Sequence, residues 1–541
     1  MNDTSTGPAV RPAPTGTEPP RLGTFLARAA AVTAGLTAAG ALLGLVRDQA
    51  IAQIFGASTD SDAFLIAWTV PEMASTLLIE DAMALLMVPA FSHALARRAA
   101  DRARDPVREL VSATLPRLFA LLACAAALLI VCAPLVVGVL APGFDKPQLA
   151  VDCTRLTALT VLTFGIAGYF SAALRAHGTF VPPAGVYLAY NVGIIATTLA
   201  LHSLWGVRAA AAGVAVGGLL MVLVQLPSFV RRVTRTRTRT RPRRARRIPR
   251  QRSAPPLIGF AVLAPVVLFA VSRQSQVLVE RFLASSLPGG AISHLNYAQK
   301  VAQLPMVLSL MICTVTFPVV AKAMADGDRE RARRRVEHDL ALAGMVVLLG
   351  TALVLGYAPQ LIEVLFQRGA FDAQDTETTA TVMRVYATGL LGHCLVGALG
   401  RPFFSAGRPT WYPAAAMAGG LLVTIVAGAA AVGRFGVYGI AAANAAGITT
   451  TAVLLLCGLG SRVIAIEVRS IGISLGRLAV AAAVAAVVGG LTAPLVTGPL
   501  LSTVTGCLLV PAVFLVTGVA VRAPEVLHLL TLTRQRIRHV R

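Results

Sequence analysis

Charge is scarce in this sequence of 541 residues, in which only 13% of the residues are charged and 56% are hydrophobic. A soluble globular chain carries about 25% charged residues. Half of that figure over this length excludes a soluble enzyme, a disordered protein and a fibrous protein. The apolar residues instead form blocks of roughly 20 residues, the length at which a helix crosses a ~30 Å hydrocarbon core. The composition therefore predicts a polytopic membrane protein with no sizeable soluble domain.

Lysine and cysteine are also scarce. The lysines are Lys146, Lys300 and Lys322, so the formal net charge of +23 comes almost entirely from arginine. Of the seven cysteines, only Cys153 lies near the start of an apolar block, and the others lie inside such blocks. With no second exposed cysteine, this pattern argues against a disulfide framework.

The usual signatures of catalysis are missing from the sequence. No GxxxxGK[ST], HExxH or CxxC motif occurs, and neither His294 nor His393 belongs to a pair with metal-ligand spacing. We therefore expect no enzyme, no cofactor and no ATP-driven transport. Facilitated or ion-coupled movement remains, and the sequence leaves a coupling ion, a metal or a contribution of the membrane potential open.

Fourteen membrane-spanning helices are predicted, giving an all-α fold. Their expected ranges are 23–46, 62–90, 113–141, 153–176, 182–203, 207–230, 255–285, 294–322, 338–366, 377–406, 411–432, 436–460, 473–494 and 499–521. The corresponding domains are a disordered cytoplasmic tail (1–22), an N-lobe of six helices (23–230), an arginine-rich cytoplasmic linker (231–254), a C-lobe of six helices (255–460), helices 13 and 14 (461–521) and a basic cytoplasmic tail (522–541).

Arginine clusters in alternate loops, as the positive-inside rule requires of cytoplasmic loops. The loops 91–112, 231–254 and 323–337 and the tail from 522 are strongly basic, whereas the loops between them are acidic, mixed or neutral. We therefore place both termini in the cytoplasm. The run at 231–252 holds twelve arginines and no acid. Because it has no interleaved aromatic residues for base stacking, we interpret it as a topology-fixing linker and expect no nucleic-acid partner; an anionic-lipid site is the alternative.

A weak internal repeat accompanies this division. Phe55-Gly-Ala-Ser58 in the first half corresponds to Phe282-Leu-Ala-Ser285 in the second, at an offset of about 228 residues, and each is followed by a short outside loop and a helix. Both halves start inside and contain six helices. This arrangement is typical of parallel repeats related by an axis along the membrane normal.

Charges inside apolar helices are the most informative residues, because each costs several kcal/mol unless it faces a cavity or finds a partner. Arg47 and Asp48 close the first predicted helix, and Asp62 opens the second, which also contains Glu80 and Asp81. Arg273, Glu280 and Arg281 lie in the seventh and Lys300 early in the eighth. Their concentration on helices 1, 2, 7 and 8 predicts a polar cavity there, with snorkelling or internal salt bridges as the alternative. We expect Arg47 and Arg273 to face each other across it.

Five motifs resemble the MurJ/MviN lipid II flippases, in family order over nearly the whole chain. They are GLVRDQAIAQIFGASTDSDAFLIAWTVPE (44–72), VPAF (88–91), NYAQKVAQLP (296–305), LFQRGAFDAQDT (365–376) and RPFFSAGRPTWYP (401–413). The resemblance implies the multidrug/oligosaccharidyl-lipid/polysaccharide exporter fold, in which two six-helix lobes form a V and two C-terminal helices are added. It also implies translocation of an undecaprenyl-diphosphate-linked peptidoglycan precursor by alternating access.

The site residues follow from the resemblance and the charges together. A cationic cavity suits a diphosphate, because contacts from arginine are charge-assisted and often bidentate. We expect Arg47, Lys300 and Arg273 to bind substrate, and Asp48, Asp62 and Glu80 to act in gating. Helices 13 and 14, which are almost free of charge, would suit the lipid tail.

The sequence departs from the family pattern in its cavity cations. Two positions that usually carry arginine are Ala41 and Ser75, and the usual arginine of the eighth helix is Lys300. Arg273 stands where the family commonly has a small or polar residue and could compensate in part. These departures leave open a flippase for another polyprenyl-diphosphate glycan and a non-transporting scaffold or regulator that kept the fold. A polysaccharide-repeat flippase or cation-coupled drug exporter of the same superfamily is a further alternative, against which the motifs at 44–72 and 365–376 argue.

The expected location is the cytoplasmic (inner) membrane, crossed many times. The expected partners are the polyprenyl-diphosphate lipid substrate and the surrounding membrane lipids. We expect a monomeric transporter of peptidoglycan biosynthesis and hence of cell-wall and cell-shape maintenance, and association with cell-wall synthesis proteins is left open.

Overall fold

The computed structural model describes residues 21–100, 105–234, 260–309, 326, 328–405, 410–462, 466–528 and 531, and the statements below concern these residues. All regular structure in this part of the chain is helical. The first half contains α1 (Arg21–Phe55), α2 (Thr59–Ala74), the π-helix η1 (Ser75–Ala82), α3 (Met83–Ala100), α4 (Pro106–Val131), α5 (Ala133–Leu140), α6 (Pro147–Ala176), α7 (Val181–Ala184), α8 (Val186–Trp205) and α9 (Arg208–Thr234).

The second half is helical in the same way. It contains α10 (Phe260–Ala284), α11 (Ala291–Ala302), α13 (Arg329–Phe366), α14 (Ala373–Ala387), α15 (Leu390–Ser405), α16 (Tyr412–Arg462), α17 (Val468–Thr492), the 3-10 turn η2 (Ala493–Leu495) and α18 (Pro499–Ala520). Eight of the described helices are long and apolar enough to cross a membrane, and a ninth span results if α14 and α15, bent by 48°, are taken together. The predicted all-α polytopic fold is confirmed.

The long helix α16 is a folded-back pair. Its 51 residues include Gly436, whose φ of 52° and ψ of −130° are not helical. A Cβ built on Gly420 would collide with the hydroxyl of Thr451, so residues on opposite sides of Gly436 lie against each other. The two arms match the separately predicted helices 411–432 and 436–460. Glycine is required at the reversal, because a positive φ strains other residues.

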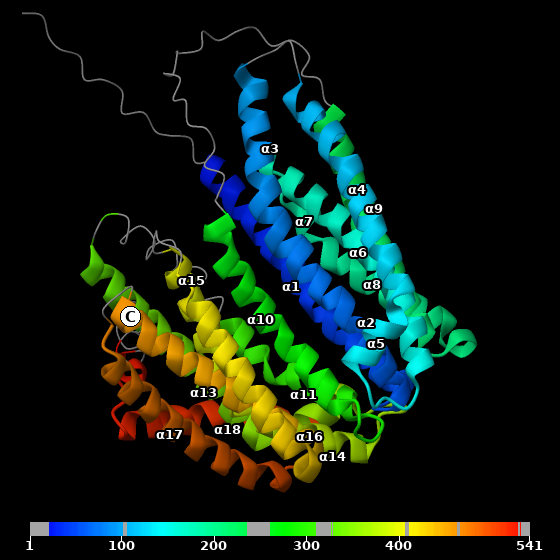
Figure 1. Ribbon diagram of the computed structural model, residues 1–541. Helices are drawn as coiled ribbons and strands as arrows, with labels where there is room; N and C mark the ends of the chain where they lie inside the picture. The colour runs from blue at the N-terminus through cyan, green and yellow to red at the C-terminus, as the bar shows by residue number, and fades with distance from the viewer. Residues whose placement is uncertain are drawn as a thin grey trace, which may run out of the picture.

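The helices form two groups that meet at one end and diverge at the other (Figure 1). Helices α1–α9 make the first group, the N-lobe, and α10–α16 make the second, the C-lobe. At the meeting end α11 contacts α2, and α10 contacts α2 and α5. Helices α17 and α18 pack against each other and against α13, on the outside of the C-lobe (Figure 1).

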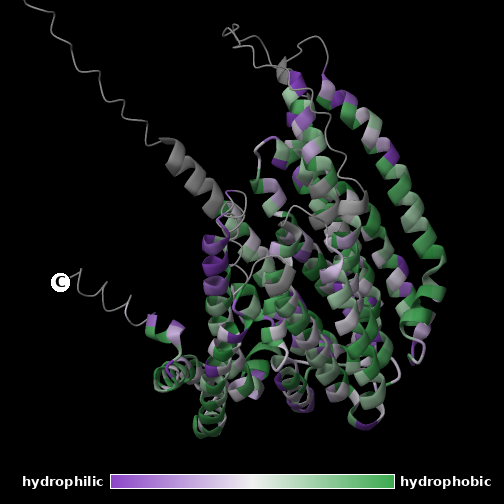
Figure 2. Ribbon diagram, turned by 60° about the vertical axis from the view of Figure 1, so that its left-hand side comes forward, coloured by the Kyte–Doolittle hydropathy of each residue, from purple (hydrophilic) through white to green (hydrophobic). Residues whose placement is uncertain are grey.

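Hydrophobic residues predominate along the helices, and hydrophilic residues are more frequent toward several helix ends (Figure 2). Leu128 and Val131 on α4 and Leu508 and Val516 on α18 are all more than 60% exposed. In water such surfaces would be unstable, whereas in a bilayer they contact hydrocarbon. The buried core runs through both lobes and includes Tyr297 and Tyr357.

Several element boundaries differ from those expected: the expected helix 113–141 is divided into α4 and α5, the expected helix 377–406 is divided into α14 and α15, and α13 begins at Arg329. Two further differences concern α1 and α2. Helix α1 continues to Phe55 rather than closing at Arg47 and Asp48, because these two charges find partners inside the protein (below) and need not reach water. The predicted second helix is three consecutive segments, α2, η1 and α3, since the π-helical turn follows soon after Pro71, which cannot donate a backbone hydrogen bond. The linker residues 235–254 and the N-terminal residues 1–20 lie outside the described residues.

Candidate functional site

Arg47, on α1, is held by three side chains of the N-lobe. Its Nε and Nη2 donate to Oδ1 of Asp48 at 2.9 and 2.7 Å, and its Nη1 donates to Oδ1 of Asn191 on α8 at 3.0 Å. The indole of Trp68 on α2 stacks on the guanidinium, with 4.3 Å from Cζ to the ring centroid. Arg47 and Asp48 are only 7% and 6% exposed. The guanidinium is therefore fixed in one orientation.

Asn191 fixes this orientation because its own amide cannot turn. Its Nδ2 donates to the carbonyl oxygens of Gly40, at 3.0 Å, and Tyr187, at 2.9 Å. With Nδ2 committed to two acceptors, Oδ1 must face Arg47. Helix α8 approaches α1 closely at Gly40, where an added Cβ would meet Cβ of Tyr187 at 3.1 Å. The pairing thus depends on a small residue on α1.

Lys300 brings the C-lobe into the same group of side chains. Its Nζ donates to Oδ2 of Asp48 at 3.0 Å and lies 5.8 Å from the Trp68 ring centroid. Lys300 belongs to the last turn of α11, so this ion pair joins the two lobes. We refer to Arg47, Asp48, Trp68, Asn191 and Lys300 as the cationic cluster. With two cations against one carboxylate, the cluster carries one unit of excess positive charge.

A second polar contact closes the lobes at their meeting end. Asp62, in the first turn of α2, accepts from the backbone N–H of Gly290 at 2.8 Å and of Ser293 at 2.7 Å, and from the Ser293 hydroxyl at 2.6 Å. The Ser61 and Ser293 hydroxyls lie 2.8 Å apart. The Asp62 carboxylate thereby caps the N-terminus of α11, where unpaired N–H groups and the helix dipole favour an anion.

The loop between α13 and α14 completes this closure. The backbone N–H of Ala370 donates to the carbonyl oxygen of Gln53 at 2.8 Å, and that of Ala57 donates to Oδ2 of Asp375 at 3.2 Å. Gly369, with φ +62°, lies so close to Gln53 that a Cβ would collide with its carbonyl oxygen. We call these contacts together with those of Asp62 the lobe seal. The loops that form it are those predicted to lie outside the cell.

Two further predicted residues have different surroundings. Arg273 lies on α10, is exposed, and makes no hydrogen bond or ion pair within the described part of the chain, and no contact with Arg47 is among those that the structure shows there. Glu80 lies within η1, and its side chain is outside the described residues. The roles predicted for both stay predictions.

The buried charges of the C-lobe form a separate network. Glu280 accepts from Nδ2 of Asn444 on α16, and Arg281 donates to the Ile292 carbonyl oxygen and to Oδ1 of Asn296, both at 3.3 Å. Glu280 and Arg281 are buried. Their printed hydrogen-bond partners are neutral groups of the C-lobe, and Nε of Arg281 is buried without a hydrogen-bonding partner in the described part of the chain.

Sequence reasoning missed Asn191, Trp68 and Ser293. A signal existed for Asn191, which is a lone amide inside the apolar block 182–203, where a polar side chain needs a partner. No signal marked Trp68 or Ser293, because an aromatic or a hydroxyl side chain within a helix is ordinarily packing. Among the described residues, no group of three or more His, Cys, Asp or Glu side chains could hold a metal ion.

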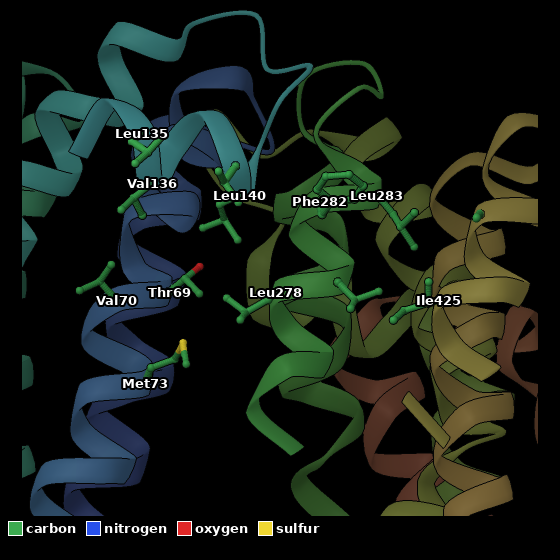
Figure 3. A pocket seen from close by; sticks show the side chains of 13 residues that line it. Thr69, Val70, Met73, Leu135, Val136, Leu140, Leu278, Phe282, Leu283 and Ile425 are labelled. Atoms are coloured by element: carbon green, nitrogen blue, oxygen red, sulfur yellow. The ribbon is translucent and has the colours of Figure 1, made fainter. Parts of the chain in front are cut away.

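An apolar pocket of about 690 Å³ lies between the lobes (Figure 3). Thr69, Val70 and Met73 of α2 and Leu135, Val136 and Leu140 of α5 line the N-lobe side. Leu278, Phe282 and Leu283 of α10 and Ile425 of α16 face them from the C-lobe (Figure 3). The only hydroxyl labelled there, that of Thr69, donates to the Leu65 carbonyl oxygen, so the pocket suits hydrocarbon.

Residues 51–509 match the family described as lipid II flippase MurJ. The chain belongs to this family. The lipid II flippase MurJ of Burkholderia cenocepacia is 29% identical over 445 residues, which cover 81% of this chain and 84% of that protein. A probable lipid II flippase MurJ of Buchnera aphidicola is 25% identical and covers 68% of this chain and 71% of its own length. The family assignment made from the sequence motifs is confirmed, and so is the expectation of a transporter rather than an enzyme.

Solved structures agree on the fold. A lipid II flippase MurJ in an inward closed conformation superposes with a TM-score of 0.68 at 18% identity, over 90% of this chain and 97% of its own. An inward-facing multidrug resistance MATE family transporter of the MOP superfamily gives 0.59 at 13% identity, over 82% and 99%. The predicted exporter fold of this superfamily is therefore confirmed, with helices α17 and α18 added to the two lobes.

Proposed function

We propose that this protein moves lipid II, the undecaprenyl-diphosphate-linked peptidoglycan precursor, across the cytoplasmic membrane by alternating access. The observation that carries the proposal is the cationic cluster, which a MurJ-family chain holds between its lobes beside a sealed end. The substrate has an anionic diphosphate, a polar head and an apolar tail. No covalent bond changes, so binding and lobe movement account for the whole activity.

The diphosphate binds to Arg47 of the N-lobe and Lys300 of the C-lobe. Arginine presents a planar fork that matches phosphate oxygens, whereas lysine acts as a point charge. Because the two cations belong to different lobes, the affinity for an anion that binds both depends on the relative position of the lobes. Arg273, exposed on α10, adds attraction for the head during entry. The polyprenyl tail stays in the bilayer while the head crosses.

Alternating access requires that the lobe seal opens while the opposite ends of the lobes approach. Asp62 is the principal gating residue, because its carboxylate makes three hydrogen bonds across the lobes. Asp48 makes a second link between the lobes, within the cationic cluster, through its ion pair with Lys300. The positive-inside rule, applied to the arginine-rich loops of the sequence, supports a cytoplasmic location for the diverging end and for both termini.

A second candidate substrate, another polyprenyl-diphosphate glycan, is favoured by Ala41, Ser75 and Lys300. Ala41 is exposed on α1, and the Ser75 hydroxyl donates to the Glu72 carbonyl oxygen, so neither supplies the cation usual in the family. Such a cavity grips a diphosphate less firmly than one with three more guanidinium groups. The substrate class is the same, and only the glycan differs.

Rescue of cells depleted of their lipid II flippase tests the proposal. We expect the wild-type chain to restore growth and the outward appearance of labelled lipid II. Lys300→Arg combined with Ala41→Arg should increase rescue if lipid II is the substrate. Unchanged rescue together with loss of native activity would indicate the other glycan. A chain that is inserted normally but never rescues, with or without these changes, would point to a scaffold and refute the proposal.

A further inference from the structure

Both oxygens of the Asp48 carboxylate accept hydrogen bonds from the two cations of the cationic cluster. Oδ1 accepts from Nε and Nη2 of Arg47, and Oδ2 accepts from Nζ of Lys300. A phosphate makes the same two kinds of contact: its oxygens accept from the planar fork of an arginine and from the ammonium group of a lysine. In the described part of the chain, Asp48 has no other hydrogen-bonding partner.

We propose that Asp48 is a built-in substitute for the diphosphate, which the incoming anionic head must displace to reach Arg47 and Lys300. This inference rests on the proposed function, since it takes the substrate to be a diphosphate. Binding is then an exchange of one anion for another at the same two cations. The chemical class that competes is a diphosphate or other compact polyanion.

Charge and burial explain why the empty site needs such a substitute. Arg47 and Asp48 are buried, and Lys300 is partly buried. A buried and a partly buried cation without a counter-ion would cost several kcal/mol. Asp48 removes one unit of that charge when no substrate is present. A diphosphate, with more negative charge than one carboxylate, competes for the cluster because it neutralises both cations.

The surroundings of Arg47 allow the carboxylate to leave without disturbing the guanidinium. Asn191 and Trp68 hold Arg47 independently of Asp48. Asp48 itself breaks only its contacts with Arg47 and Lys300 when its side chain turns away. Arg47 is therefore a fixed receptor and Asp48 the exchangeable group.

Exchange also changes what connects the lobes. In the structure the ion pair of Lys300 with Asp48 joins α11 to α1. In the loaded protein the diphosphate bridges Lys300 and Arg47 instead. Return of Asp48 to the cations then assists release of the head, so the same residue lowers affinity and promotes turnover.

Binding of inorganic pyrophosphate to the purified full-length protein in nanodiscs tests the inference by calorimetry. Asp48→Asn removes the competing charge while keeping the side-chain shape. We expect this variant to bind pyrophosphate about 10-fold more tightly than the wild type, and to transport more slowly. Asp60→Asn is the matched control, because Asp60 forms a 2.7 Å ion pair with Lys146 away from the cluster. We expect its affinity for pyrophosphate to equal that of the wild type.

Asp48→Ser serves as a second variant if the amide prevents folding, and it should also bind more tightly. Unchanged or weaker binding by the folded variants would overturn the inference, since Asp48 would then support Arg47 rather than compete with substrate. Absence of pyrophosphate binding to both wild type and variants would overturn it as well. If Asp48→Asn binds pyrophosphate more tightly but the wild-type chain does not rescue flippase-depleted cells, the exchange is retained and only the proposed substrate is refuted.

Discussion

The carboxylate of Asp62 accepts hydrogen bonds from both the backbone N–H and the hydroxyl of Ser293, at 2.7 and 2.6 Å. The two residues belong to different lobes, 231 positions apart in the chain. Together with the ion pair of Lys300 and Asp48, this contact makes two polar links between α11 and the N-lobe. One link lies at the first turn of α11 and the other at its last turn. A movement of α11 therefore changes the contacts of both the lobe seal and the cationic cluster.

Asp62→Asn should weaken the lobe seal. The amide retains one acceptor, but its NH2 group faces a backbone donor and cannot accept. Hydrogen bonds to a charged group contribute about 1.5–3 kcal/mol, so a loss of about 2 kcal/mol shifts the closed-to-open equilibrium roughly 30-fold. A Ser75→Cys reporter should then react faster with a membrane-impermeant maleimide added outside. Asp60→Asn is the control, and equal labelling rates in the two variants would contradict a gating role for Asp62.

Arg47→Ala should abolish transport while the protein still inserts. The change removes the fork that receives the diphosphate and leaves Asp48 paired with Lys300 alone. Rescue of flippase-depleted cells measures transport, and membrane fractionation measures insertion. Arg208→Ala is the matched control, because Arg208 also bonds an aspartate, Asp152 at 2.8 Å, but in an exposed pair away from the cluster. Normal rescue by Arg47→Ala would refute its role as the main contact.

Asn191→Leu should weaken pyrophosphate binding, because Arg47 loses the partner that fixes its Nη1. We expect about a 10-fold loss, corresponding to one hydrogen bond to a charged group at about 1.4 kcal/mol. Gln225→Leu is a matched control, since Gln225 is a buried amide that bonds Ser171 and the Ala167 carbonyl oxygen elsewhere in the N-lobe. Both variants lose thermal stability. A binding loss shared equally by the two would show that Asn191 acts through stability alone.

Gly217→Ala should destabilise the N-lobe. A Cβ at this position of α9 would lie 2.5 Å from the carbonyl oxygen of Tyr190, a backbone atom that cannot turn aside. Overpacking of this kind costs about 1–3 kcal/mol, and it displaces Tyr190, whose ring packs against Trp68 with centroids 6.0 Å apart.

Gly138→Ala provides the comparison for that change, because nothing lies within 4 Å of a Cβ at Gly138 on α5. Alanine is favoured over glycine in a helix by about 1 kcal/mol, so this variant should unfold at the same or a higher temperature. Thermal denaturation in detergent measures both variants. A Gly217→Ala protein as stable as the wild type would show that α8 and α9 can move apart without cost.

The sequence by itself determined the all-helical membrane fold and the family, and it singled out Arg47, Asp62 and Lys300 as candidate site residues. A bilayer forces every backbone polar group to be satisfied within its own segment, so apolar length alone locates helices, and even the reversal inside α16 was visible as two separate blocks. A charge in such a block is costly wherever it lies, which singled out the cations and acids without any knowledge of their neighbours.

Only the tertiary structure decided what those charges touch. Asn191 reaches Arg47 across 144 residues, and Lys300 reaches Asp48 across 252. Such pairings depend on how each helix is rotated about its axis and on which lobe faces it, and neither is encoded in local hydrophobicity. For the same reason the sequence ended α1 at Arg47 and Asp48, whereas the partners supplied by α8 and α11 let the helix continue to Phe55. A charge can be buried only where neighbouring side chains pair with it, and the packing of the helices decides which side chains those are.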